Sequence, residues 1–103
     1  MTVHRLKSWP EFFEPLLDGS KTFELRKNDR DYRVGDHLLL QEYEPRTDTY
    51  TGREIGRRVS YVLTGAGVGS IAPLKGLAMG YAILGLEDVE MVEVAIPVRE
   101  GVG

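Results

Sequence analysis

Cysteine is absent from this chain of 103 residues. Without a thiol, the chain has no disulfide, no thiolate metal site, no iron–sulfur cluster and no cysteine nucleophile. No apolar run approaches the roughly 18 residues of a membrane-spanning helix, and the N-terminus lacks the apolar core of a signal peptide. These absences predict a protein of a reducing compartment, the cytoplasm.

Neither sign of charge dominates, because 13 basic residues stand against 16 acidic residues and the net charge is −3. This balance excludes a polycation that coats nucleic acid. The charge is nevertheless uneven: residues 61–103 contain only two bases, Lys75 and Arg99, whereas residues 21–33 contain five. Any anion-binding patch is therefore expected in the first third of the chain. The length of residues 1–103 predicts a single domain.

Hydrophobic periodicity predicts a short strand over residues 3–7, followed by a short helix. Ser8 is expected to cap the helix, with Glu11 completing a capping box. Pro15 is expected to shorten or kink the helix, and Gly19 to end it in the left-handed conformation. Its apolar stripe is expected to comprise Phe12, Phe13, Leu16 and Leu17.

Period-two alternation then predicts a strand over residues 22–26, with Phe23 and Leu25 in the core and Glu24 and Arg26 on a polar face. Further strands are expected at 37–43, at 53–64 with Val59, Tyr61 and Leu63 on one face, at 81–86 and at 90–98, where Pro97 indicates a sheet edge. About six short strands with one or two helices predict a small β-barrel of class α+β.

The polar face of residues 22–26 is the first candidate site. Glu24 and Arg26 point the same way, and Lys21 precedes the strand. A lysine beside a carboxylate in a cleft can clamp phosphate, or serve as a base or nucleophile. The alternative is a solvated strand face without a binding role.

The loop over residues 27–33 alternates bases with one aromatic residue. Arg30 and Arg33 could contact phosphates, and Tyr32 could stack on a base. The alternative is a turn held by its own Asp–Arg pairs. Four other tyrosines are expected in the core or a hairpin rather than as stacking platforms: Tyr43, Tyr50, Tyr61 and Tyr81.

The glycine-rich segment 65–69 follows a strand, but its spacing matches neither the dinucleotide fingerprint nor the Walker A motif. A lid or a plain loop is therefore favoured over a phosphate cradle. His4 and His37 lack a neighbouring metal-ligand pattern, and no serine nucleophile elbow is present. We expect no metal and no cofactor.

One ordered motif resembles a known family. The stretch from Gly19 to Arg26 fits G-x-K-x-x-E-x-R, which resembles the signature of the ASCH domain in the PUA-like superfamily. Further segments are similar to a small bacterial and phage subfamily of unknown function: 9–13, 26–30, 34–36, 50–54 and 81–86. The resemblance covers about residues 3–86.

The resemblance implies a PUA-like β-barrel with a cleft between barrel and helix, in which relatives bind RNA or recognise modified bases. One ASCH-type branch hydrolyses acylated cytidine nucleosides with a lysine, a threonine and a glutamate, and another is a ribonuclease. Lys21 matches that lysine, whereas Glu24 stands where that branch has its threonine. The resemblance also implies that Lys21, Glu24 and Arg26 face a functional cleft.

Three hypotheses follow. The first is a nucleic-acid-binding module for RNA or a single-stranded or modified base, in which Lys21 and Arg26 contact phosphate or a base carbonyl and Glu24 accepts from a base amino group. Arg30 and Arg33 would supply contacts at the rim. The second is a small hydrolase of a modified nucleoside or of RNA, with Lys21 and Glu24 catalytic. The third is a protein-interaction module that uses the glycine-rich segment and an edge strand. We expect an RNA or nucleoside partner and no membrane.

Overall fold

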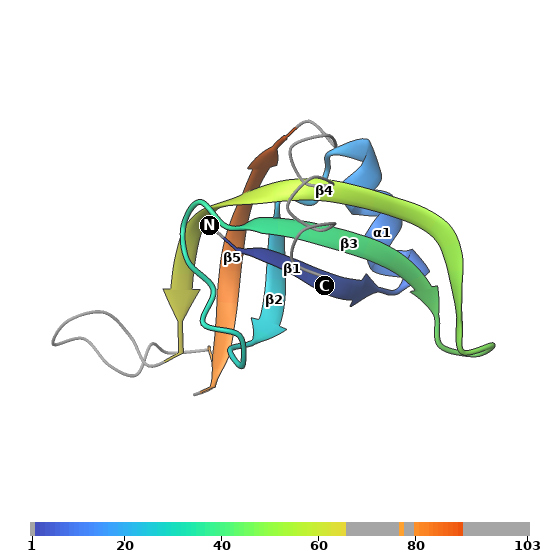
Figure 1. Cartoon of the computed structure of the whole chain (residues 1–103), viewed down its shortest axis with the longest axis horizontal. Helices are drawn as coiled ribbons and strands as arrows, with labels where there is room; N and C mark the ends of the chain where they lie inside the picture. Colours follow the sequence, from blue (N-terminus) through green and yellow to red (C-terminus); the bar gives the residue numbers. More distant parts are fainter. Residues whose placement is uncertain (1, 66–76, 78–79, 90–103) are drawn as a thin grey trace, which may run out of the picture.

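The computed structural model describes residues 2–65, 77 and 80–89, and these form one helix and five strands. The elements are β1 (Val3–Ser8), α1 (Pro10–Asp18), β2 (Phe23–Lys27), β3 (His37–Glu44), β4 (Thr49–Thr64) and β5 (Tyr81–Asp88). The strands form one sheet in the order β1-β3-β4-β5-β2, in which only the β1–β3 pair is parallel. The sheet curls into a half-barrel (Figure 1), so the predicted α+β class with a small barrel-like sheet is confirmed.

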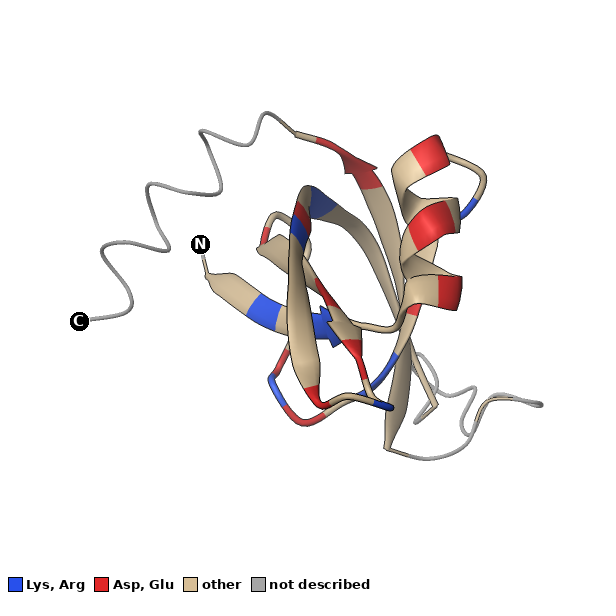
Figure 2. Cartoon of the chain, turned by 90° about the vertical axis from the view of Figure 1, so that its right-hand side faces the viewer, with Lys and Arg blue, Asp and Glu red and all other residues tan. Residues whose placement is uncertain are grey.

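The core lies between the sheet and α1, which packs along one side of the curved sheet (Figure 2). Phe13 and Leu16 of the helix are almost completely buried. They belong to one cluster with residues of all the strands except β2, and with one loop residue: Leu6, Tyr32, Leu38, Leu40, Ile55, Val59, Ala82 and Leu84. Phe12 and Leu17, expected on the same apolar stripe, are 49% and 47% exposed. The buried stripe of this short helix is therefore narrower than predicted.

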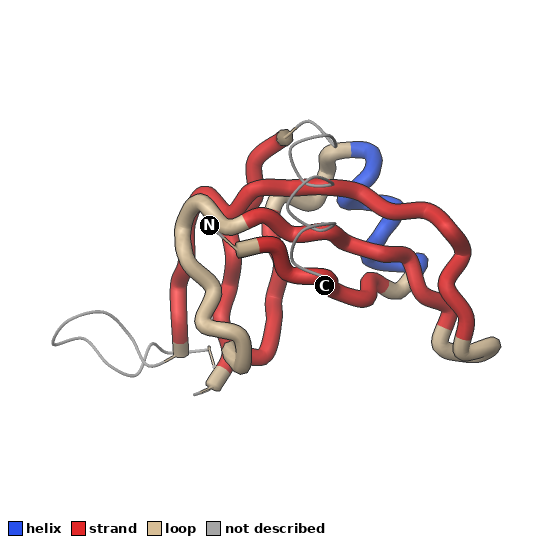
Figure 3. The backbone as a smooth tube through the Cα atoms, viewed as in Figure 1, coloured by secondary structure: helices blue, strands red, loops and turns tan. Residues whose placement is uncertain are grey.

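The long strand β4 gives the sheet its curvature, as the tube in Figure 3 shows. Its first part pairs with β3 and its second part with β5. The register with β5 shifts between Val59 and Tyr61, and such a bulge bends and twists a strand. The bulge also corrects a prediction, since Val59 is fully buried whereas Tyr61 is 60% exposed. The two side chains do not share a face.

The start of α1 differs from the prediction. Trp9 is the N-terminal cap residue and makes no capping hydrogen bond with its side chain. Ser8 is the last residue of β1 and is buried, so the predicted capping box is wrong. Pro15 lies inside the helix, and Gly19 ends it with a positive φ of 86°, as predicted. Glycine suits this position because a Cβ is unfavourable at positive φ.

No helix in the described ranges has the length and apolar character needed to span a bilayer. The strand predicted over residues 90–98 and the glycine-rich segment after Gly65 lie outside the described residues.

Candidate functional site

Three charged residues that the sequence places side by side meet at β2. Glu24 is only 3% exposed, and its two carboxylate oxygens have different partners. Lys21 Nζ donates to Oε1 at 2.9 Å, and Arg26 Nε donates to Oε2 at 2.8 Å. A buried carboxylate requires such partners, because an unpaired charge is costly to remove from water. We call Lys21, Glu24 and Arg26 the charge cluster.

The strand β2 faces the opposite way from the prediction. Phe23 and Leu25, expected in the core, are 47% and 54% exposed, whereas Glu24 is buried. The prediction assumed that the apolar face of an alternating strand turns inward. However, within the described part of the chain β2 is an edge strand that pairs with β5 alone. Its inward position holds a carboxylate that two cations neutralise, and its apolar side chains remain accessible.

A pocket of ≈ 540 Å³ opens beside the charge cluster. Small-molecule sites in proteins usually occupy about 300–1,000 Å³, so this pocket can hold a small organic ligand. Its lining comes from the end of β1, the start of α1, the loop before β2 and β2 itself: Lys7, Ser8, Trp9, Phe12, Lys21, Phe23, Glu24, Leu25 and Arg26. All three members of the charge cluster therefore line one concave surface.

Aromatic side chains form the rim of this pocket. Trp9 and Phe12 are stacked, with ring centroids 6.5 Å apart, and both are nearly half exposed. Lys21 Nζ lies 5.2 Å from the ring centroid of Phe12 and 5.6 Å from that of Phe23, within cation–π range. We call Trp9, Phe12 and Phe23 the aromatic rim. It offers a flat apolar surface next to a fixed positive charge.

Ser8 supplies a polar side chain to the pocket wall. The residue is 3% exposed and lines the pocket. Its Oγ has no hydrogen-bond partner among the described residues. Most buried hydroxyls in proteins are hydrogen-bonded, because an unpaired one loses its interaction with water. The hydrogen-bonding capacity of this buried hydroxyl is therefore unused among the described residues.

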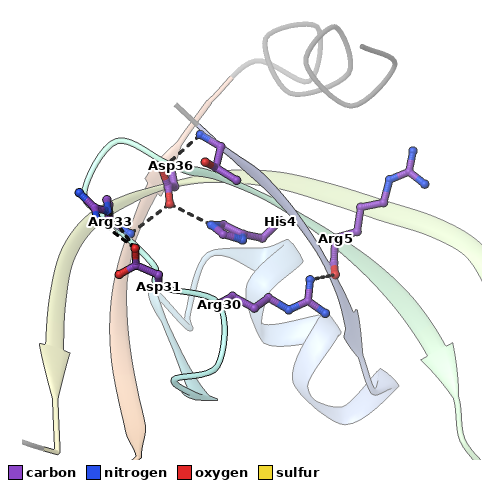
Figure 4. A network of polar contacts seen from close by, with 7 residues as sticks. His4, Arg5, Arg30, Asp31, Arg33 and Asp36 are labelled. Atoms are coloured by element: carbon purple, nitrogen blue, oxygen red, sulfur yellow. Dashed lines mark hydrogen bonds and ion pairs between the residues drawn. The ribbon is translucent and has the colours of Figure 1, made fainter. Parts of the chain in front are cut away.

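Guanidinium groups bridge the seam between the edge strand β1 and the segment that begins with β2. Arg26 Nη2 donates to the carbonyl oxygen of Lys7 at 2.6 Å. Arg30 Nη1 donates to the carbonyl oxygen of Arg5 at 3.1 Å (Figure 4). These carbonyls lie on the edge of β1 that none of the five described strands covers. Side chains thus take the place of strand pairing here.

The loop before β3 does not present its aromatic residue to solvent. Tyr32 is only 6% exposed and meets His4 edge-on, with ring centroids 4.7 Å apart. Burial raises the pKa of Tyr32, while nearby Arg30 acts in the opposite direction. The interpretation of Tyr32 as a stacking platform is therefore corrected. Arg33 is exposed and pairs with Asp31 at 3.0 Å, the contact expected of a turn held by its own charges.

Asp36 anchors this loop through a buried pair with His4 (Figure 4). His4 Nε2 lies 2.8 Å from Asp36 Oδ2, and the backbone amides of Arg33 and Thr2 also donate to this carboxylate. Burial opposes ionisation, but these hydrogen bonds outweigh it and lower the pKa of Asp36. The pair stabilises the loop and lies outside the pocket lining.

The remaining sequence candidates are distributed over the fold. Tyr50, Tyr61 and Tyr81 are exposed, and Tyr43 meets Tyr50 edge-on in the β3–β4 hairpin. His37 is buried, and neither of its ring nitrogens has a hydrogen-bond partner among the residues that the structure describes. No group of three or more metal-ligating side chains occurs in the part of the chain that the structure describes.

Sequence reasoning missed Lys7, Ser8, Trp9 and Phe12 as pocket residues. They lie at the end of β1, at the cap of α1 and in α1, and only the curvature of the sheet brings them next to β2. One available indication was the pair Phe12-Phe13, because adjacent residues of a helix point in different directions. A short helix that buries Phe13 in the core therefore directs Phe12 away from the core.

Two comparisons with known proteins found similarities to this chain. Residues 3–86 match a family described as a domain of unknown function, DUF3850. The chain is also 34% identical over 83 residues to a protein of Escherichia phage P2 described as "Uncharacterized 12.9 kDa protein in GpA 3'region", a match that covers 70% of this chain and 74% of the phage protein. This chain therefore belongs to the DUF3850 domain family.

Proposed function

We propose that this domain is a nucleic-acid-binding module that holds a base or nucleotide in the pocket beside the charge cluster. The combination of pocket groups carries the proposal: an exposed aromatic rim, a fixed cation and a buried hydroxyl without a partner. Aromatic rings stack on the faces of bases, and polar groups at the floor would meet the edge of the base. The resemblance to ASCH domains of the PUA-like superfamily supports the same proposal.

Each member of the charge cluster has a role in this proposal. Lys21 and Arg26 would attract phosphate or a base carbonyl. Glu24 fixes both cations and, because a carboxylate oxygen can accept more than one hydrogen bond, retains capacity for a base amino group. Ser8 Oγ can donate or accept and would complete the recognition of one base edge.

The hydrolase hypothesis has less support from the geometry. Lys21 Nζ is held by Glu24 and lies over two aromatic rings. An ammonium ion held in an ion pair is not a nucleophile. The same arrangement suits a binding cation, so we favour recognition over turnover.

Trp9 makes the proposal directly testable, because it is the only tryptophan in the chain and lines the pocket. Titration with each of the four ribonucleoside monophosphates should quench its fluorescence. Phe12→Ala should weaken binding by about 1–3 kcal/mol, the usual contribution of one base–aromatic stack. Leu17→Ala is the matched control, since Leu17 lies on the same helix with similar exposure but outside the lining. Absence of quenching by every nucleotide, or equal losses in the two variants, would contradict the proposal.

A further inference from the structure

A second groove of ≈ 390 Å³ follows the outer side of β1. Its lining comprises Arg5, Leu6, Lys7, Arg26, Arg30, Gln41 and Tyr50. Every charged residue in this lining is basic, although the whole chain has a net charge of −3. Figure 2 shows acidic residues along α1, whereas the coloured residues of β1 are basic. The groove therefore concentrates positive charge on one side of an acidic protein.

The cations of this groove are poorly neutralised. Among the described residues, neither Arg5 nor Lys7 forms an ion pair, and Arg30 donates only to a backbone carbonyl. In Figure 4 the Arg5 side chain points away from the Asp36 network. Only Arg26 has a carboxylate partner, Glu24. Positive charge without internal counter-ions attracts an external anion.

The groove and the pocket are continuous, because Lys7 and Arg26 line both. Tyr50 is 54% exposed at the groove and offers one more ring to a base. A ligand that occupied both would place an aromatic group in the pocket, cross the seam at Arg26 and continue past several cations. A chain of phosphates with bases attached has this pattern.

We propose that the groove binds the phosphodiester backbone of a single-stranded oligonucleotide whose base occupies the pocket. This inference rests on the proposed function and extends it, because it makes the ligand a polymer rather than a free nucleoside. Arg5, Lys7 and Arg30 contact successive phosphates, and Arg26 joins the two sites. A duplex does not fit this assignment, because its bases are stacked and paired and cannot enter the pocket.

The test compares ligands of increasing length on wild type and two variants. Nucleoside monophosphates, dinucleotides and hexanucleotides of RNA and DNA are titrated, with Trp9 fluorescence for the short ligands and anisotropy of a labelled hexanucleotide for the long ones. Arg5→Gln removes one cation from the groove, and Arg5 is not part of the pocket lining. Arg33→Gln is the control, because it removes one exposed cation that lines neither site.

Affinity should rise from mononucleotide to hexanucleotide in wild type. For a single strand, each phosphate contact contributes about 0.7 to the steepness with which the logarithm of the binding constant falls with the logarithm of the salt concentration. The loss of one contact should therefore weaken hexanucleotide binding about eightfold at ~50 mM salt and about threefold at ~200 mM. Arg5→Gln should show this loss for the hexanucleotide and none for the mononucleotide, while Arg33→Gln shows neither.

The outcomes separate the two proposals. If mononucleotides bind but length and Arg5→Gln have no effect, the groove assignment is wrong and the pocket remains. If hexanucleotides bind through Arg5 while no mononucleotide reaches Trp9, the groove assignment is supported and the base pocket is wrong. If no ligand of any length binds, both are overturned. Preference for RNA or DNA identifies the polymer.

Discussion

Glu24 and Glu42 are buried to almost the same extent, at 3% and 4% exposed, yet their surroundings differ. Glu42 accepts from Arg53 at 2.8 and 2.9 Å and from Thr51 at 2.6 Å, and Arg53 lies over the ring of Phe13. These partners all belong to the β3–β4 hairpin and its neighbouring helix, and they hold the hairpin against the core.

The partners of Glu24, by contrast, line a cavity. Lys21 and Arg26 have side chains that are 18% and 24% exposed, whereas that of Arg53 is 46% exposed. A buried carboxylate in this fold is therefore not by itself a mark of a site. What distinguishes Glu24 is that its cations face a concave surface with a free hydroxyl, and not open solvent.

The largest expected effect sharpens this contrast. Glu24→Ala should cost about 3 kcal/mol of folding free energy, because it leaves two partly buried cations without their shared counter-ion. Glu42→Ala should cost less, since the half-exposed Arg53 is solvated and retains its pair with Glu14. Urea denaturation of both variants measures the order. A larger loss for Glu42→Ala would show that the contrast is wrong.

The second largest effect is expected on acidification, which should remove the stabilisation that ionised Glu42 provides. Hydrogen bonds from Arg53 and Thr51 lower the pKa of Glu42 below its usual value of 4.5. A carboxyl whose pKa is lower in the folded state stabilises the fold above its usual pKa, and this contribution is lost as pH falls through the folded pKa. Asp36 behaves in the same way below 3.8. Thermal melting from pH 6 down to pH 3 should therefore show less acid destabilisation in Glu42→Gln than in wild type. If the melting temperatures of wild type and Glu42→Gln fell equally with pH, ionised Glu42 would not contribute to stability.

A smaller loss of stability is expected when Lys21, which lines the pocket, is replaced. Lys21→Ala removes one charged hydrogen bond and the contact with two rings, and it should cost about 1 kcal/mol, because Arg26 still pairs with Glu24. Lys21→Met keeps much of the packing and separates the two contributions. Nucleotide affinity should fall in both variants when compared at equal folded fraction. Unchanged affinity in both would remove Lys21 from the binding site.

The smallest stability effect is expected at Ser8. Ser8→Ala removes a buried hydroxyl that has no partner, so the free energy of unfolding should stay within about 0.5 kcal/mol of wild type or rise slightly. Ligand binding should nevertheless weaken, because the group is free for a ligand. A clear loss of stability would show that the hydroxyl already has a partner in the folded protein.

The sequence predicted the positions of the elements better than their orientation. Alternation located β2 correctly, but a period of two does not say which face turns inward. Lys21 and Arg26 neutralise the carboxylate of Glu24, so this side chain of β2 can be buried, and Phe23 becomes part of the aromatic rim. The prediction that Phe23 lies in the core is thus wrong, since its side chain is 47% exposed.

The pocket could be predicted only in part for a related reason. Motif spacing groups residues that are close in sequence, and it found Lys21, Glu24 and Arg26. Lys7 and Ser8 reach the same pocket because β4 bends and brings β1 towards β2, and no local pattern encodes that approach. Tyr32 was misassigned because a polar, charged loop suggested exposure, whereas its ring packs against His4.

The arginine bridges across the seam have a consequence for solubility. An uncovered edge strand is a template on which another chain can add a strand, the first step of many aggregates. In β1, the carbonyls of Lys7 and Arg5 are already occupied by Arg26 and Arg30, and their own side chains place two positive charges along that edge. A second copy approaching this edge would meet like charge and occupied acceptors. At these two carbonyls, the edge of β1 therefore offers no free acceptor to a strand of a second copy.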